Sequence, residues 1–114
     1  MSARDPVSLH EIAASATGRA GVIWALQGGG DLNANLVRFE GGRGVGEHVN
    51  DEVDVLIVGV SGSGLVGVDG EEHPVAIGGM VFVPRGARRY TRAVSDEFVY
   101  LSAHRRRGPL RIGG

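Results

Sequence analysis

The alternation of hydrophobic and polar residues predicts one short helix, followed by a long series of short strands. Within residues 6–18, Ser8 and Glu11 stand at the spacing of a capping box, which is typical of a helix start. Gly18 can end the helix, and no helical period follows it. Hydrophobic residues repeat on one helical face at Leu9, Ile12, Ala13 and Ala16.

From residue 21 onward, hydrophobic or alternating runs are separated by glycine-rich stretches at intervals of about 8–12 residues, a pattern typical of an all-β sandwich or barrel. Asp69 and Gly70 give a hairpin signal. Residues 41–46 are expected to form a flexible corner, and residues 61–64 a turn. The expected strands are 21–27, 32–40, 52–60, 65–70, 71–79, 80–87, 88–94 and 97–104.

The length of 114 residues predicts a single domain with a core of its own. We divide it into an N-terminal helix or arm over 1–20, a β-barrel over 21–104 and a basic tail over 105–114. The 20 glycines agree with many tight turns. The sequence has no cysteine, which excludes disulfides, thiolate metal sites and thiol nucleophiles from it.

The charge pattern gives no sign of a nucleic-acid or membrane partner. The net charge is −1, and the basic run at residues 104–111 has no aromatic residues interleaved with it. No hydrophobic run reaches membrane-spanning length, and the first residues lack the apolar run of a signal peptide. We therefore expect a cytoplasmic protein.

The segment 46–59 holds the main candidate chemistry, since a histidine and carboxylates lead directly into a hydrophobic strand. Three residues separate His48 from Glu52, and six separate Glu52 from Gly59. A second spaced set follows, in which five residues separate Gly78 from Pro84. It continues with Gly86, two residues after Pro84.

In these two motifs the chain resembles the cupin superfamily. The resemblance implies an all-β, cupin-type jelly-roll β-barrel, here with the short N-terminal helix. It also implies a homodimer, as is common among small cupins. The strand 52–60 is hydrophobic on both faces, so it needs a second sheet or a partner subunit as cover.

The resemblance places the family's metal-ligand positions on four residues, of which only two can bind a metal. His48 and Glu52 carry donor atoms, whereas Gly46 has no side chain. Arg89 stands where the second motif has histidine, and its guanidinium stays protonated without a lone pair to give. A catalytic metal normally takes three protein ligands, so this set is a degenerate metal site.

Arg89 leaves three interpretations open. If it faces into the barrel, it can form an internal ion pair with Glu52. It can instead combine with His48 into a cationic site for a small carboxylate or phosphate, with Glu52 and Asp54 as further ligand-binding residues. The third interpretation is a divalent metal (Fe, Zn, Ni or Mn) held by His48, Glu52 and a third ligand, with His104, Asn50 and Asp54 as the candidates for that ligand.

Two functions follow from these alternatives. The first is a barrel that binds a small anion and needs no metal cofactor, with Arg89 in place of a metal-ligand histidine. The second is a metal-dependent enzyme of dioxygenase or isomerase type. Under either function, Arg89→His is expected to raise the affinity for a divalent metal, because it restores a third ligand.

Overall fold

The protein, described by a computed structural model over residues 5–107, is an antiparallel β-structure with one short helix. The predicted all-β class is therefore confirmed. The ends of the predicted arm and tail, residues 1–4 and 108–114, lie outside the described residues. The elements are α1 (Leu9–Ala14), β1 (Gly21–Ala25), β2 (Leu32–Glu40), β3 (Gly44–Val49), β4 (Val55–Val68), β5 (Glu71–Val75), β6 (Met80–Val83) and β7 (Arg88–Arg105).

The helix begins where the capping box predicts. Ser8 is its N-cap, and the Ser8 hydroxyl accepts a hydrogen bond of 3.2 Å from the backbone N–H of Glu11. The hairpin signal is also confirmed, because Asp69 and Gly70 both adopt positive φ, at 49° and 85°. Two successive positive φ values are what a two-residue turn of type I′ requires.

Two predicted chain breaks are wrong, since β4 and β7 each run through them. The stretch 61–64 lies inside β4, where the pairing with β7 shifts register on either side of Ser61–Gly62. Gly62 has a φ of 68°, so glycine here forms a β-bulge that bends the strand rather than ending it. Likewise, the expected strands 88–94 and 97–104 are one strand of 18 residues. The expected corner 41–46 is partly wrong too, because β3 begins at Gly44.

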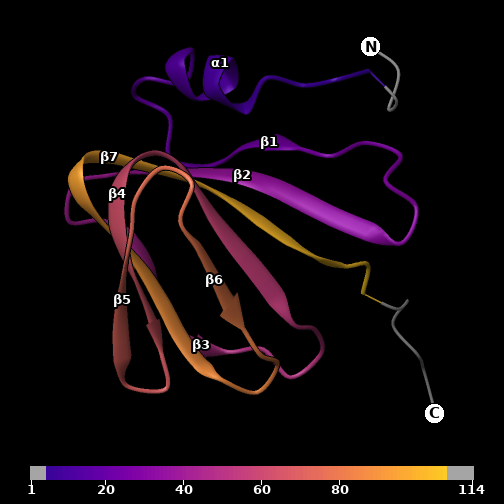
Figure 1. Cartoon of the computed structure of the whole chain (residues 1–114), viewed down its shortest axis with the longest axis vertical. Coiled ribbons are helices and arrows are strands. Elements are labelled where there is room, and N and C mark those ends of the chain that lie inside the picture. The colour runs from indigo at the N-terminus through magenta and orange to yellow at the C-terminus, as the bar shows by residue number, and fades with distance from the viewer. Residues whose placement is uncertain (1–4, 108–114) are drawn as a thin grey trace.

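The two long strands take part in both halves of the molecule. Residues 88–92 of β7 pair with β3, whereas its residues 97–105 pair with β2. β4 accompanies β7 on its other side along both halves, and it also pairs with β5 and β6. Figure 1 shows β7 rising along one side, turning beyond β4 and continuing beside β2. The bend in these strands folds the sheet around an interior.

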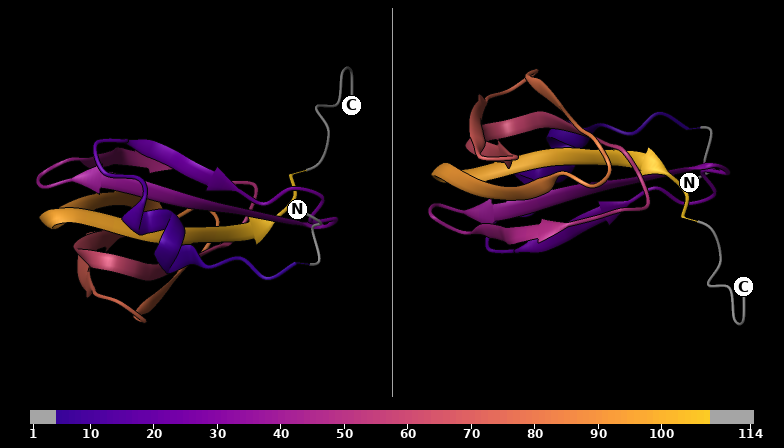
Figure 2. Two further views of the ribbon diagram at one scale, coloured as in Figure 1. Left: turned by 90° about the horizontal axis from the view of Figure 1, so that it is seen from above. Right: turned by 90° about the horizontal axis from the view of Figure 1, so that it is seen from below.

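Helix α1 packs on the outer face of the sheet, against β4 and β1, and the left view of Figure 2 shows it in front of β7. Leu36 and Val99, both with no exposed surface, pack there against Ala13 and Ala16 of the N-terminal segment. The larger core fills the interior between the strands and includes Phe98. The helix therefore supplies part of the cover that doubly hydrophobic strands require.

Arg38 ties this layer to the chain that leads from the helix. It is 4% exposed, and its Nε lies 2.9 Å from a carboxylate oxygen of Glu97. Its Nη1 donates to the backbone oxygen of Arg19 at 2.8 Å, and the other Glu97 oxygen accepts from the Ser61 hydroxyl at 2.9 Å. Glu40 adds a longer contact, 3.6 Å from Nη1. This network gives the buried guanidinium charged and neutral acceptors.

One outer face of the β4–β6 pair remains hydrophobic and exposed. Leu56 lies opposite Phe82 and Val58 opposite Met80 in the pairing of these strands. The exposed fractions are 41% for Leu56, 52% for Phe82 and 63% for Met80. The homodimer stays a prediction.

Within residues 5–107, no helix is both long and hydrophobic enough to span a membrane.

Candidate functional site

A cavity of about 190 Å³ opens into the interior formed by the bent strands. Strands β1, β2, β3, β4 and β7 all contribute to its wall. Alternate residues face inward along parts of β2, β4 and the second half of β7. Its polar and charged lining residues are Asn35, His48, Asn50, Arg89, Tyr90, Thr91, Tyr100, Ser102, His104 and Arg107. Its hydrophobic lining residues are Val22, Val37, Val45, Val55, Ile57 and Val66.

Arg89 is the most deeply buried charged group in this wall, with 7% of its surface exposed. Its Nη2 donates long hydrogen bonds to the backbone oxygens of Asn50, at 3.3 Å, and Pro84, at 3.5 Å. Its Nε is buried and has no hydrogen-bond partner among the described residues. Burial lowers the pKa of the Arg89 guanidinium, and the nearby positive charge of Arg107 lowers it further.

His48 lies directly opposite Arg89 in the antiparallel pairing of β3 with β7. Its Nδ1 lies 2.8 Å from the backbone oxygen of Gly46. A carbonyl oxygen can only accept a hydrogen bond, so Nδ1 carries a proton and Nε2 is left free for other partners. The structure thus brings His48 and Arg89, which the sequence places together, to the wall of one cavity.

His104 also lines the cavity. Tyr100, Ser102 and His104 follow at intervals of two along β7, and all three line the cavity. The Nδ1 of His104 lies 2.7 Å from the backbone oxygen of Arg105, so the same reasoning leaves its Nε2 free. The wall of the cavity therefore carries two imidazoles as well as two guanidiniums.

The internal ion pair between Arg89 and Glu52, one of the three interpretations, does not form. Within residues 5–107, the carboxylate of Glu52 lies near Arg107 instead, with 3.7 Å between an oxygen and Nε. The Glu52 side chain is 63% exposed, and its backbone oxygen accepts 2.9 Å from Nη2 of Arg105. Glu52 thus sits outside the cavity wall and partly balances the charge of Arg107 at the mouth.

Glu52 lies in a turn that Asn50 stabilises. Its side-chain oxygen accepts a hydrogen bond of 2.9 Å from the backbone N–H of Glu52, an Asx turn that reverses the chain after β3. Asp54, beyond the same turn, is exposed and accepts 2.8 Å from the backbone N–H of Arg85. Neither carboxylate lines the cavity. The ligand-binding roles assigned to Glu52 and Asp54 stay predictions.

The floor of the cavity contains a paired set of hydroxyls. The oxygens of Tyr100 and Thr91 lie 3.0 Å apart, and both residues are at least nine-tenths buried. Burial raises the pKa of the Tyr100 phenol, while the hydrogen bond with Thr91 lowers it by less. Thr91 also accepts 3.3 Å from the backbone N–H of Val45. These hydroxyls already have partners without a ligand.

The residues at the family's metal positions do not fit a metal ion. Arg89 presents a permanent positive charge to the interior, and Glu52 points toward Arg107. Across residues 5–107, no three side chains of His, Asp or Glu come together as metal ligands would. The conditional metal set of His48, Glu52 and His104 is therefore not gathered at one point.

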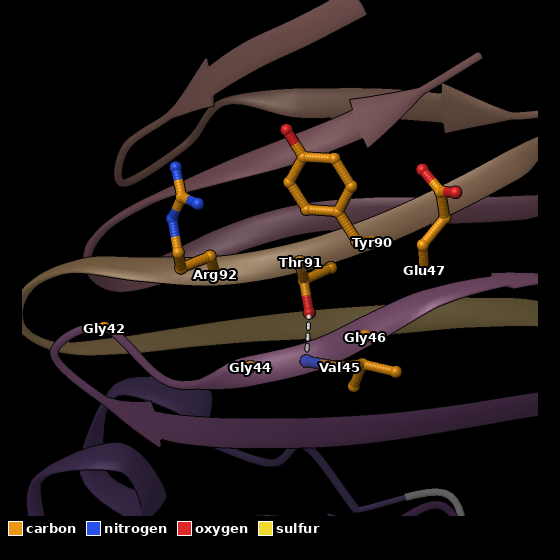
Figure 3. A pocket seen from close by; sticks show the side chains of 8 residues that line it. All are labelled: Gly42, Gly44, Val45, Gly46, Glu47, Tyr90, Thr91 and Arg92. Carbon is orange, nitrogen blue, oxygen red and sulfur yellow. Dashed lines mark hydrogen bonds between the residues drawn. The ribbon is translucent and has the colours of Figure 1, made fainter. Parts of the chain in front are cut away.

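A second hollow, a groove of about 350 Å³, lies on the outside between β3 and β7. Figure 3 shows Gly46, the family's first histidine position, on the strand here without a side chain to offer. The groove carries Glu47 and Arg92, whose charges are opposite, beside Tyr90. The dashed line in the figure is the hydrogen bond from Val45 to Thr91. The groove therefore lacks the excess of positive charge that the interior cavity has.

Several residues of the cavity wall are not among the sequence predictions. Tyr100 and Ser102 can be found from the alternation that leads to His104 along β7. Arg107 follows the last strand and lies within the predicted tail, where no periodic signal indicates its direction. Its place at the cavity depends on the chain path beyond β7.

Comparison with known proteins bears directly on this barrel. A family model described as the cupin domain matches residues 35–103, well over half of the chain. The chain belongs to the cupin family. The predicted cupin-type jelly-roll fold is confirmed with it, and the interior cavity is the cavity of a cupin barrel.

Solved structures agree with this cupin fold at low sequence identity. TT1209 from Thermus thermophilus gives a TM-score of 0.77 at 21% identity, covering 90% of this chain and 98% of that one. NMB1881 from Neisseria meningitidis gives 0.74 at 17%, covering 90% and 100%. A cupin-2 domain containing protein from Shewanella frigidimarina gives 0.72 at 14%, covering 88% and 94%. A comparison with curated proteins finds no match.

Proposed function

We propose that this cupin binds a small anion in its barrel, with Arg89 in place of a metal-ligand histidine. The observation that carries the proposal is the charge of the cavity wall. Two guanidiniums and two imidazoles line it, and no carboxylate does among the described residues. A carboxylate or phosphate group would meet several hydrogen-bond donors in a partly desolvated site, where such bonds are strong.

Arg89 is the residue that a bound anion would stabilise most. Its guanidinium is largely withdrawn from water, its Nε lacks a partner among the described residues, and its two hydrogen bonds from Nη2 are long. Arg107 adds a second positive charge that Glu52 balances only from the outer side. A bound anion would offset the cost of keeping these charges close together.

The alternative is a metal-dependent enzyme of dioxygenase or isomerase type. It would need three donors, whereas the wall offers the imidazoles of His48 and His104, and Arg89 occupies the position of a family ligand. Metal content per protomer, measured by plasma mass spectrometry on protein purified without a chelating column, separates the two proposals. We expect well under one equivalent of Fe, Zn, Ni or Mn.

The test of anion binding is calorimetry with acetate, phosphate and sulfate at constant ionic strength. We compare the wild type with Arg89→Met and with a matched control, Arg88→Met. Arg88 is the neighbouring arginine on β7, is 66% exposed at its side chain and does not line the cavity. Loss of Arg89 should weaken binding about tenfold or more, which corresponds to one charged hydrogen bond. Equal affinities in the two variants would contradict the proposal.

A further inference from the structure

The cavity has a charged rim and a hydrophobic floor, and this division bears on the kind of anion that it suits. His48 and Arg107 are exposed at the opening, and His104 is half-buried. Val66 has no exposed surface and Ile57 has 4%, so they lie at the closed end. A ligand that fills this space must therefore be charged at one end only.

The floor offers hydrophobic contact and little else. Val37, Val55, Ile57 and Val66 belong to the main core cluster together with Tyr100. Burying hydrophobic surface against them contributes about 25 cal/mol per Å². A sulfate or phosphate ion could gain nothing there and would lose its hydration if it entered that far.

The hydroxyls of the floor already have hydrogen-bond partners, so they do not require polar atoms from a ligand. Tyr100 and Thr91 hold each other at 3.0 Å, and Thr91 accepts from Val45 as well. The other uncharged polar wall residues away from the rim are Asn50, Tyr90, Asn35 and Ser102. Asn35 and Ser102 lie opposite each other in the pairing of β2 with β7. Both Asn35 and Ser102 are half-buried, above the floor. A polyhydroxylated acid would leave most of its hydroxyls against valines.

The volume of about 190 Å³ lies below the usual range of roughly 300–1,000 Å³ for sites that hold drug-sized ligands. We infer, resting on the proposed anion-binding function, that the ligand is a small monocarboxylate with a compact hydrophobic body. Its carboxylate lies toward the rim, where the guanidinium N–H groups of Arg89 and Arg107 can donate hydrogen bonds to it. Its hydrophobic body packs against the valines of the floor.

Calorimetry with benzoate, acetate, sulfate and the neutral isostere benzamide tests this inference on the wild-type protein. Benzoate should bind at least about tenfold more tightly than acetate or sulfate, and benzamide should bind at least about tenfold more weakly than benzoate. The variant Val37→Thr, which places a hydroxyl in the cavity wall, should weaken benzoate binding several-fold and acetate binding by much less. Val94→Thr is the control, since Val94 is 60% exposed and does not line the cavity.

The outcomes separate this inference from the function on which it rests. Equal affinities for benzoate, acetate and sulfate, all weakened in Arg89→Met, would overturn the hydrophobic ligand and retain the anion site. Binding of benzamide as tight as benzoate would overturn both, because charge would then play no part. No binding of any probe to the folded wild type would also overturn both.

Discussion

His48 and Arg89 lie directly opposite each other across the β3–β7 pairing, and both side chains line the cavity. Directly opposed residues of an antiparallel pair have their Cβ atoms about 4.5–5.5 Å apart. An imidazole and a guanidinium can thus bind the same small group. The same pair of positions would suit a metal if both held histidine.

Arg89→His is therefore expected to raise the affinity for Ni²⁺ by about tenfold or more over the wild type. The change removes a positive charge from the interior and places a second imidazole opposite His48. Calorimetric titration with Ni²⁺ measures the gain. The double variant Arg89→His/His48→Ala should lose it, and a gain that survives this second change would mean that the metal binds elsewhere.

Arg89→Met is expected to stabilise the fold by about 1 kcal/mol, although it should weaken anion binding about tenfold or more. The backbone oxygens that Arg89 contacts keep other donors, because Gly86 donates to Asn50 at 2.7 Å and Ala87 donates to Pro84 at 3.2 Å. Methionine fills much of the same volume without a buried charge. Urea unfolding measures the change against Arg88→Met. A clear loss of stability would mean that the guanidinium supports the fold.

Glu97→Gln is expected to destabilise the protein by about 2 kcal/mol, because it leaves the buried charge of Arg38 without its closest carboxylate. Glu97 is 32% exposed at its side chain, which makes the loss smaller than for a fully buried pair. The control is Glu40→Gln. Glu40 also contacts Arg38 but is 58% exposed, so its loss should stay under about 1 kcal/mol. Equal urea midpoints for the two variants would contradict the assigned importance of the Glu97 contact.

We expect the folded protein to lose stability at alkaline pH because the phenol of Tyr100 is buried. Its pKa is raised in the folded protein by burial, so above pH values near 10 the unfolded chain gives up this proton first. Stability from this group is complete below the unfolded pKa, and it declines as the pH rises through the folded one. Urea midpoints between about pH 8 and about pH 11 should fall less steeply in Tyr100→Phe than in the wild type.

Comparison of the two slopes removes other contributions to this pH dependence. A hydrogen bond to Glu72 raises the pKa of Tyr90 as well, but Tyr90 is present in both proteins. At neutral pH the variant should be less stable by about 1 kcal/mol, from the lost bond to Thr91. Parallel slopes would mean that Tyr100 ionises as freely in the folded protein as in the unfolded chain.

The sequence predicts an element correctly where a few neighbouring residues decide it, and less well where pairing with a distant strand decides it. The capping box of Ser8 and the turn at Asp69–Gly70 both appear as expected. The pattern at residues 61–64 predicts a turn because the glycine that forms a tight turn is also the glycine that forms a bulge. Whether the strand continues through Gly62 depends on its pairing with β7, which lies far away in the sequence.

The sequence predicts the site residues correctly where the family position lies on a strand that lines the cavity. His48 and Arg89 lie where the motifs place them. The resemblance assigns Glu52 to the interior, which would require the alternation of β3 to continue from His48 past Asn50. β3 ends at Val49 and β4 starts at Val55, and the Asx turn of Asn50 lies between them. The alternation therefore does not carry over to Glu52.

The long strands β4 and β7 belong to both halves of the molecule, and the cavity is lined from both halves. Neither half can lose its hydrogen bonds without removing strands from the other, so unfolding should proceed as a single cooperative transition. An occupant of the cavity then stabilises the whole chain to an extent set by its concentration relative to its dissociation constant. Melting temperature alone thus becomes a direct assay for anything that enters the barrel.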